Sequence, residues 1–270
     1  MPHSNQSLQP LRLLQFTDTH LLADRQGRLL GLNTHESLKC VLDLSQKNHR
    51  QPDLVLVTGD LVHDGSDSGY AHLQEFFRIF DAPVLLLAGN HDEARQLRDT
   101  TTGGPARLVK QIERGGWRIV LLDSSIPGSD GGRLAATELA LLDQQLSAAP
   151  TLPALVCLHH QPVPMGSRWL DTMVLENAGE FFAVLDRHPQ VRGVLWGHVH
   201  QEYDHVRNGV RLLATPSTCF QFKPHSVDFA LDATPPGYRW LDLHPDGRID
   251  SGVCRLARVS TNLDMQSSGY

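Results

Sequence analysis

The sequence predicts an α/β fold, and the spacing of its apolar residues carries this prediction. Six short runs rich in Leu and Val are too short for buried helices and are typical of strands covered on both faces. Amphipathic segments with helical spacing lie between them, so strand and helix alternate over the first two-thirds of the chain. The later segments are shorter and separated by turns, which predicts antiparallel strands.

The predicted elements follow in order along the chain. Strands are expected at 11–17, 53–58, 83–88, 117–123, 154–158 and 191–196, and helices at 34–47, 70–80, 136–148 and 177–187. Leu38, Val41 and Leu42 share one side of the first helix, which predicts a face that packs against a sheet. Antiparallel strands are expected within 209–215, 217–223, 228–232, 237–244 and 252–260, with hairpin turns at 207–209 and 245–247.

A single domain is expected from residue 1 to 258, followed by an irregular tail from 259 to 270. Of the 270 residues, 40% are hydrophobic and 20% are charged, and no Ser-rich or Pro-rich linker interrupts them. The tail has little apolar content, which is typical of irregular structure.

Charge and composition argue against several classes of protein. The net charge of −6 is spread without runs of like charge, so neither a nucleic-acid polymer nor an anionic membrane is an expected partner. The opening residues, MPHSNQSLQP, do not resemble a signal peptide, and no apolar run reaches the roughly 18 residues that span a bilayer. Cys40, Cys157, Cys219 and Cys254 lie far apart, which favours reduced thiols. We therefore expect a soluble cytoplasmic protein.

Polar side chains directly follow five of the expected strands. The clusters are Asp18-Thr19-His20, Gly59-Asp60, Gly89-Asn90-His91-Asp92, His159-His160-Gln161-Pro162 and Gly197-His198-Val199-His200. Each motif alone is weak, because 15 histidines in 270 positions produce about one H-x-H pair by chance. Five clusters that each follow a strand are much harder to attribute to chance. Since the carboxyl ends of strands form the crevice of an α/β sheet, we expect the clusters to converge.

The chemistry of these side chains predicts a pair of metal ions. Carboxylate, imidazole and amide oxygen are donors for divalent ions, and the absence of thiolate disfavours a structural zinc site. The candidate ligands are Asp18, His20, Asp60, Asn90, His160, His198 and His200, which is more than one ion needs. If Asp60 serves both ions, the set matches a two-metal centre with ions about 3.5–4 Å apart.

The ordered motifs D-x-H, G-D, G-N-H-D, H-x-P and G-H-x-H resemble those of the calcineurin-like metallophosphoesterase superfamily. The resemblance implies a four-layer α/β/β/α sandwich in which two central mixed sheets carry two metals at one edge. Longer stretches at 31–38, 168–181, 197–202 and 212–224, with the terminal Gly269-Tyr270, are similar to the bacterial class III 3′,5′-cyclic AMP phosphodiesterases. They imply a small cyclic-nucleotide substrate that is opened to 5′-AMP.

The resemblance also implies a role for each ligand. Asp18, His20, Asp60 and His200 are expected to hold one ion, and Asp60, Asn90, His160 and His198 the other. The H-x-P spacing selects His160, with His159 as the alternative, because neighbours in an extended segment point to opposite sides. Iron or manganese is the expected metal, and such a mixed nitrogen and oxygen site also accepts zinc or cobalt.

The expected reaction is in-line attack on phosphorus by a hydroxide that both ions share, with the ribose 3′ oxygen leaving. Asp60 and His91 are the expected catalytic residues, and His91 would face the phosphate without binding metal. Asp92 is expected either to orient His91 or to cap the helix that follows. Contacts with the substrate are expected from His20, Asp60, Asn90, His91, His160 and His200.

The remaining candidates have plainer interpretations. His35, His49, His63, His72, His188 and His205 are expected on the surface or on helices, and His225 either near the site or capping a turn. Trp169, Phe220 and Phe222 are expected to pack in the core rather than to stack on a base. Glycerophosphodiesters, 2′,3′-cyclic nucleotides and phosphomonoesters are the alternative substrates. A non-catalytic scaffold is disfavoured, because no ligand is missing.

Overall fold

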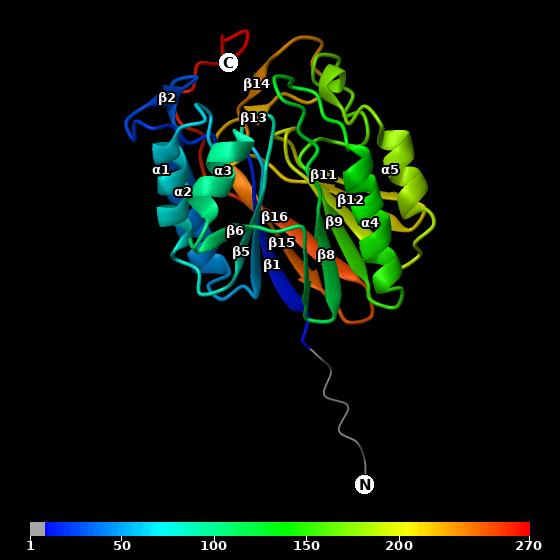
Figure 1. Cartoon of the computed structure of the whole chain (residues 1–270). Helices are drawn as coiled ribbons and strands as arrows, with labels where there is room; N and C mark the ends of the chain where they lie inside the picture. Colours follow the sequence, from blue (N-terminus) through cyan, green and yellow to red (C-terminus); the bar gives the residue numbers. More distant parts are fainter. Residues whose placement is uncertain (1–8) are drawn as a thin grey trace.

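A computed structural model describes residues 9–270, and two six-stranded mixed sheets form its centre (Figure 1). The first sheet has the order β16 (Ile249–Arg255), β15 (Gly237–Leu243), β1 (Leu11–Phe16), β4 (Leu54–Thr58), β5 (Val84–Leu87) and β6 (Ala106–Leu108). The second has the order β11 (Tyr203–Arg207), β12 (Val210–Ala214), β10 (Val191–Trp196), β9 (Ala154–Cys157), β8 (Trp117–Leu121) and β7 (Gln111–Arg114). β1, β4, β5 and β6 run parallel in the first sheet, as β8, β9, β10 and β12 do in the second.

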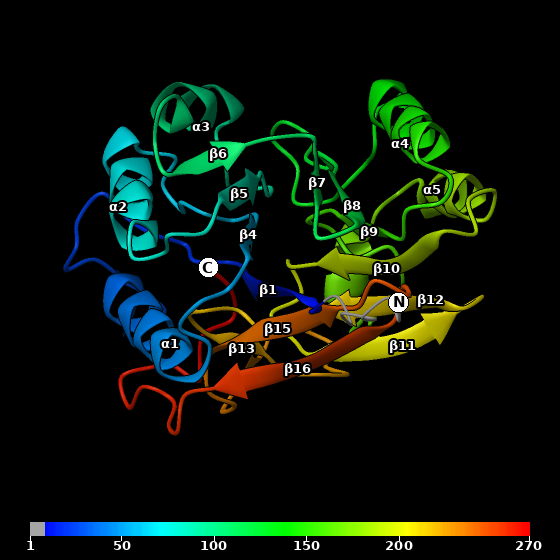
Figure 2. The ribbon, with the colours of Figure 1, turned by 90° about the horizontal axis from the view of Figure 1, so that it is seen from below.

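Helices cover the outer face of each sheet, and Figure 2 shows the resulting layers from below. α1 (Thr34–Asn48), α2 (Asp67–Phe77) and α3 (Ala94–Thr101) lie over the first sheet, and α4 (Ala136–Ala148) and α5 (Ala178–Leu185) lie over the second. The smaller elements are the pairs β2 (Arg28–Leu29) with β3 (Leu32–Asn33) and β13 (Gln221–Phe222) with β14 (Leu231–Asp232), and the 3-10 helix η1 (Leu170–Met173). The expected α/β/β/α sandwich is confirmed.

The central strands are apolar on both faces because each face is covered. In β1, Leu13 lies in the layer between the two sheets, whereas Leu14 packs beneath the helices. In β4, Leu56 likewise lies between the two sheets and Val57 packs beneath the helices. All four side chains are fully buried. This alternation follows from the pleat of a strand, which turns successive side chains to opposite faces.

Helix α1 shows how local sequence places an element. The side chain of Asn33 accepts the backbone N–H of Glu36 at 2.9 Å and so caps the first turn, which explains why the helix begins at Thr34. The side chains of Leu38 and Val41 are fully buried against the first sheet. Capping and the apolar face therefore agree on the position of the helix.

The structure confirms the six expected central strands and the four expected helices, with ends that differ by a few residues. It corrects the expectation for the last third: β12 pairs antiparallel with β11 but parallel with β10. The segments 217–223 and 228–232 contain only the two-residue strands β13 and β14. The short helix expected after Asp92 is present as α3. β6, β7 and β11 were not expected, and β11 was missed because it is a largely exposed edge strand without an apolar run.

No helix within residues 9–270 combines the length and the apolar character that crossing a membrane requires. The expectation that the opening residues are not a signal peptide concerns residues 1–8 above all, which lie outside the described part of the chain.

Candidate metal centre

The loops that carry the five polar clusters meet at one edge of the two sheets. β1 begins at the bottom of Figure 1 and runs upward, so the carboxyl ends of β1 and of the strands parallel to it face the top. Backbone hydrogen bonds join the loops: Asp18 N–H donates to the carbonyl of Gly59 at 3.0 Å. Gly197 N–H likewise donates to the carbonyl of His159 at 3.2 Å. The predicted convergence of the strand ends is therefore present in the fold.

Backbone strain is concentrated in these loops. Positive φ angles between 42° and 64° occur at Asp18, His20, Asp60, His198 and His200. Residues with a side chain rarely adopt this region, and each such residue costs on the order of 1–3 kcal/mol. Such strain persists only where the surrounding structure holds it and is typical of functional sites.

One group of metal donors consists of Asp18, His20 and His200, whose ligand atoms all lie within 4.8 Å of one another. Nδ1 of His200 donates to the carbonyl of Phe220 at 2.8 Å, so its Nε2 carries a lone pair. This Nε2 lies 3.3 Å from Nε2 of His20 and 3.5 Å from Oδ1 of Asp18. Two nitrogens bound to one tetrahedral ion at about 2.1 Å would be about 3.4 Å apart, so the spacing fits a shared cation.

A second group consists of Asp60, His159 and His198. Nδ1 of His159 donates to the carbonyl of Thr58 at 2.9 Å, which directs Nε2 toward the carboxylate of Asp60. That Nε2 lies 3.3 Å from Oδ2 of Asp60 and 3.2 Å from Oδ1 of Asn90. Nε2 of His198 is buried and has no hydrogen-bond partner among the described residues. A buried nitrogen without a partner is costly unless something else binds it, and a metal ion would do so.

Asp60 connects the two groups. Its Oδ2 lies 3.3 Å from Nε2 of His159 and 3.7 Å from Nε2 of His20, so it faces one imidazole of each group. Its Oδ1 accepts the backbone N–H of His91 at 3.0 Å. The carboxylate is thus positioned to be shared between two ions.

His160 lies outside both donor groups, although the H-x-P spacing selected it. Its Nδ1 lies 2.9 Å from Oγ of Ser124, and its ring packs on that of His198 with 4.7 Å between centroids. Its Nε2 is buried and has no hydrogen-bond partner among the described residues, as is the case for Nε2 of His198. Both ring nitrogens of His159, by contrast, have partners in Thr58 and Asn90. His160 therefore stays the predicted ligand, with His159 as the alternative, and the other six predicted ligands lie together.

Electrostatics adjust the protonation of these side chains. Burial lowers the pKa of His20 and of His198 well below the usual value. Burial would raise the pKa of Asp60, but His159 and the nearby histidines outweigh it and hold that pKa well below the usual value. Burial would lower the pKa of His159, but Asp60 and Asp18 outweigh it and raise that pKa to about 9.

His91 and Asp92 have separate roles. The ring of His91 lies 4.9 Å from that of His20, between centroids. His91, His20 and His63 form a third cluster of possible donor nitrogens, which contains no carboxylate. Asp92 neither orients His91 nor caps α3, which corrects both expectations. Its carboxylate instead accepts the backbone N–H groups of Leu61 and Gly89, while the residue at the N-cap of α3 is Glu93. Asp92 thus ties the loop after β5 to the loop after β4.

His63 belongs to the site and was not expected there. Its Nδ1 lies 3.4 Å from Nδ1 of His20, and its ring packs on His91 with 4.8 Å between centroids. The only signal in the sequence is its position three residues after Asp60, in the same loop. The partner on the far nitrogen of a metal-binding imidazole fixes the orientation of its ring, so His63 is placed to orient His20.

The glycines of the motifs leave room for the donor side chains. A Cβ on Gly59, where φ is +93°, would lie under 3.0 Å from Nδ1 of His159. A Cβ on Gly89 would also lie under 3.0 Å from Oδ1 of Asp60. A Cβ on Gly197 would lie under 3.0 Å from Oδ2 of Asp18. The G-D, G-N-H-D and G-H-x-H motifs therefore require glycine for steric reasons.

The aromatic candidates differ in burial. Phe220 is fully buried and Phe222 is 2% exposed, and Phe222 stacks on His200 with 4.2 Å between centroids. Trp169 is only partly buried and packs against Phe222 and Phe229. The expected core packing holds for Phe220 and Phe222, which form the floor under the histidines.

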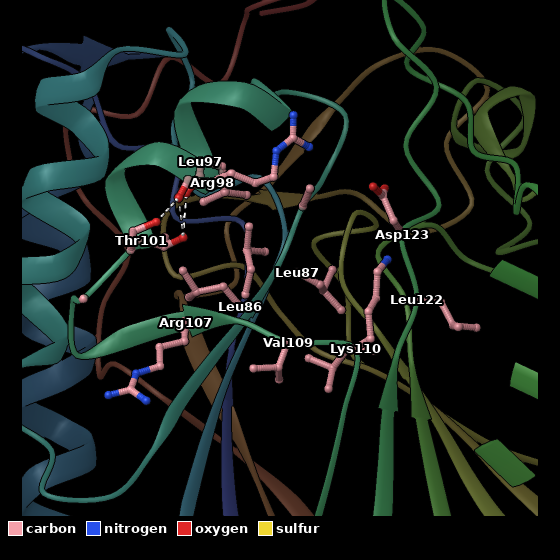
Figure 3. A pocket seen from close by; sticks show the side chains of 15 residues that line it. Leu86, Leu87, Leu97, Arg98, Thr101, Arg107, Val109, Lys110, Leu122 and Asp123 are labelled. Carbon is pink, nitrogen blue, oxygen red and sulfur yellow. Dashed lines mark hydrogen bonds between the residues drawn. The ribbon is translucent and has the colours of Figure 1, made fainter. Parts of the chain in front are cut away.

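A separate hollow of about 750 Å³ lies between α3, β6 and the end of β8 (Figure 3). Leu86, Leu97 and Leu122 are among its apolar lining residues, and Arg98 and Arg107 add positive charge. None of the residues that line it belongs to the two donor groups. The metal centre and this hollow are therefore different sites.

Two donor groups joined by one carboxylate, at the strand ends of a four-layer sandwich, define a metal-dependent phosphoesterase. The sequence profile of the calcineurin-like phosphoesterases matches residues 11–202. The chain is 44% identical over 259 residues to "3′,5′-cyclic adenosine monophosphate phosphodiesterase CpdA" of Pseudomonas aeruginosa, covering 96% of this chain and 94% of the relative. It is also 44% identical to the protein of that name from Escherichia coli K12, covering 96% and 95%. The chain belongs to the calcineurin-like phosphoesterase family.

A solved structure supports the fold. A dimetal phosphatase from Danio rerio superposes with a TM-score of 0.63 at 15% identity, covering 91% of this chain and 99% of that one. At this identity the likeness concerns the fold alone.

We expect His63→Ala to weaken metal binding about 10–100-fold, because His20 loses the partner that orients its ring. Titration of the metal-free protein with Mn²⁺, followed by calorimetry, measures the change. The matched control is His72→Ala. His72 lies away from the site, where its Nδ1 is 3.0 Å from Nε2 of His35, so its removal should leave the metal affinity unchanged. Equal affinities in the two variants would contradict the role of His63.

Proposed function

We propose that the protein hydrolyses 3′,5′-cyclic AMP to 5′-AMP at a centre of two divalent ions and so lowers cyclic AMP in the cytoplasm. The observation that carries the proposal is the position of the Asp60 carboxylate between the two donor groups. The substrate is supported by the printed names of relatives with 40–44% identity over almost the whole chain. Four free cysteines fit a reducing compartment.

In the proposed centre, Asp18, His20, Asp60 and His200 hold one ion, and Asp60, Asn90, His160 and His198 hold the other. The buried and unpartnered Nε2 of His160 supports the choice that the H-x-P spacing makes, and His159 is the alternative. When bound, the ions supply a nucleophilic water near neutral pH and neutralise the charge of the phosphate. Iron and manganese are the proposed metals, as mixed nitrogen and oxygen donors suit both.

The protein side chains of the centre orient the substrate and exclude water. Asp18, His20, His159 and His200 are at most barely exposed to solvent, so interactions with the phosphate are strong there. His20, Asp60, Asn90, His91, His160 and His200 form the proposed contact surface for the phosphate. His160 also packs on His198.

His91 is the residue proposed to move a proton. The bond from its backbone N–H to Asp60 fixes its position beside His20. From there its protonated ring can donate a proton to the ribose 3′ oxygen as the bond between this oxygen and phosphorus breaks. The product then carries a 3′ hydroxyl and a 5′ phosphate. General acid catalysis of this kind is worth about 10²–10⁴-fold in rate.

Replacing each neighbouring histidine distinguishes the two candidate ligands. His160→Ala should lower the bound metal by about half, because one ion loses a ligand, whereas His159→Ala should retain most of it. Metal content measured by plasma mass spectrometry after dialysis checks both. The reverse pattern would assign the ligand role to His159.

His91→Ala should reduce kcat by about 10²–10⁴-fold while metal content stays at the level of the unchanged protein, because the variant loses a proton donor and no ligand. Steady-state kinetics with cyclic AMP and metal analysis of the same preparation provide the measurement. A parallel loss of metal would instead identify His91 as a ligand.

The substrate is tested by assaying the Mn²⁺-loaded protein with 3′,5′-cyclic AMP, 2′,3′-cyclic AMP, bis(p-nitrophenyl) phosphate and p-nitrophenyl phosphate. We expect the highest kcat/KM with 3′,5′-cyclic AMP. A preference for another diester would replace the proposed substrate within the same family. No turnover of any of the four compounds would exclude the proposed hydrolysis.

A further inference from the structure

The last residues of the described chain return to the metal centre. Asp264 N–H donates to the carbonyl of Leu30 at 2.9 Å, and Leu263 is buried at 8% exposure in the core of the second half of the chain. A Cβ on Gly31 would lie under 3.0 Å from the carbonyl oxygen of Asn262, so the two segments are in close contact. In Figure 1 the C-terminal end lies at the top, near β13 and β14, at the edge where the donor groups meet.

Tyr270 places its ring against the histidines of the site. It stacks on His91 and on His63, with 5.7 Å and 5.8 Å between ring centroids, at interplanar angles of 25° and 21°. Its edge meets His20 at 5.6 Å. The ring therefore lies beside the proposed proton donor and beside a proposed ligand.

The same ring covers an aromatic cluster. Its centroid lies 5.2 Å from that of Phe220, 5.8 Å from Phe222 and 5.9 Å from Phe229. Phe220 and Phe222 are buried, whereas Tyr270 remains 40% exposed. Among these residues Tyr270 is thus the one that a ligand in the site can reach from solvent.

We propose that Tyr270 is a substrate-binding residue on which the nucleobase of the substrate stacks, so that nucleotides are preferred over phosphates without a base; this rests on the proposed function. The phosphate of a cyclic nucleotide is joined to its base by a single ribose. A base therefore reaches a ring that already contacts the histidines around the phosphate. Every base has a planar face, and an aromatic ring at such a position recognises it without hydrogen bonds. The base adds affinity only while the ring is present.

The test compares two product-like ligands that differ only in the base. Calorimetry on the full-length, Mn²⁺-loaded protein measures the affinity for 5′-AMP and for ribose 5-phosphate. In the unchanged protein 5′-AMP should bind more tightly. Tyr270→Ala should lower the ratio of the 5′-AMP affinity to the ribose 5-phosphate affinity about tenfold, because only the binding of 5′-AMP is weakened. Tyr270→Phe keeps the ring and should preserve the ratio.

Met265→Ala is the matched control, because Met265 lies in the same tail and is 42% exposed. It should leave the affinity ratio unchanged. Thermal unfolding and metal content of each variant show whether the fold and the centre are intact.

Three other outcomes would overturn the inference. If Tyr270→Ala raised the affinity for both ligands equally, the ring would occupy the space that the phosphate needs. If the substitution lowered both affinities equally and also lowered the unfolding temperature, Tyr270 would only anchor the tail. If the ratio did not change, the base would bind elsewhere while the proposed function stood. Failure of the unchanged protein to bind either ligand would contradict the proposed function itself.

Discussion

The buried carboxylate of Asp60 is the constraint on which the centre depends. It is 1% exposed and lies between imidazoles of two donor groups. Removing a charged group from water costs several kcal/mol unless partners compensate for it, so its neighbours must be positive or bind something positive. The same demand explains Gly89, since a larger residue there would collide with the carboxylate. Loop conformation, glycine positions and protonation states all follow from keeping this one group ionised.

The sandwich makes such a centre tolerable. Strained residues such as Asp18 and His198 sit directly beyond strands whose leucines pack between the two sheets. Close packing resists local relaxation, so the framework can hold backbone angles that an isolated loop would leave. The hydrogen bond from Gly197 to His159 adds a direct tie between adjacent strand ends.

The sequence predicted the central strands because each is apolar on both faces, and it predicted most of the site because the polar clusters follow those strands. The spacing to Pro162 selects His160, whose Nε2 is buried without a partner, but the sequence could not show that His159 also lies against Asp60. His63 could not be recognised, because its contact with His20 depends on how two loops pack. Asp92 was assigned a role near its sequence neighbours, while its actual partners include Leu61 in another loop.

The donors are divided between the two sheets. Asp18, His20, Asp60 and Asn90 follow strands of the first, whereas His159, His198 and His200 follow strands of the second. During synthesis the amino-terminal half emerges first, with its carboxylates and few of the imidazoles that complete the set. Tight capture of the cations therefore has to wait until both halves have docked. A cation held by donors from both sheets would bind only the folded chain and would therefore add its binding energy to the stability of the fold.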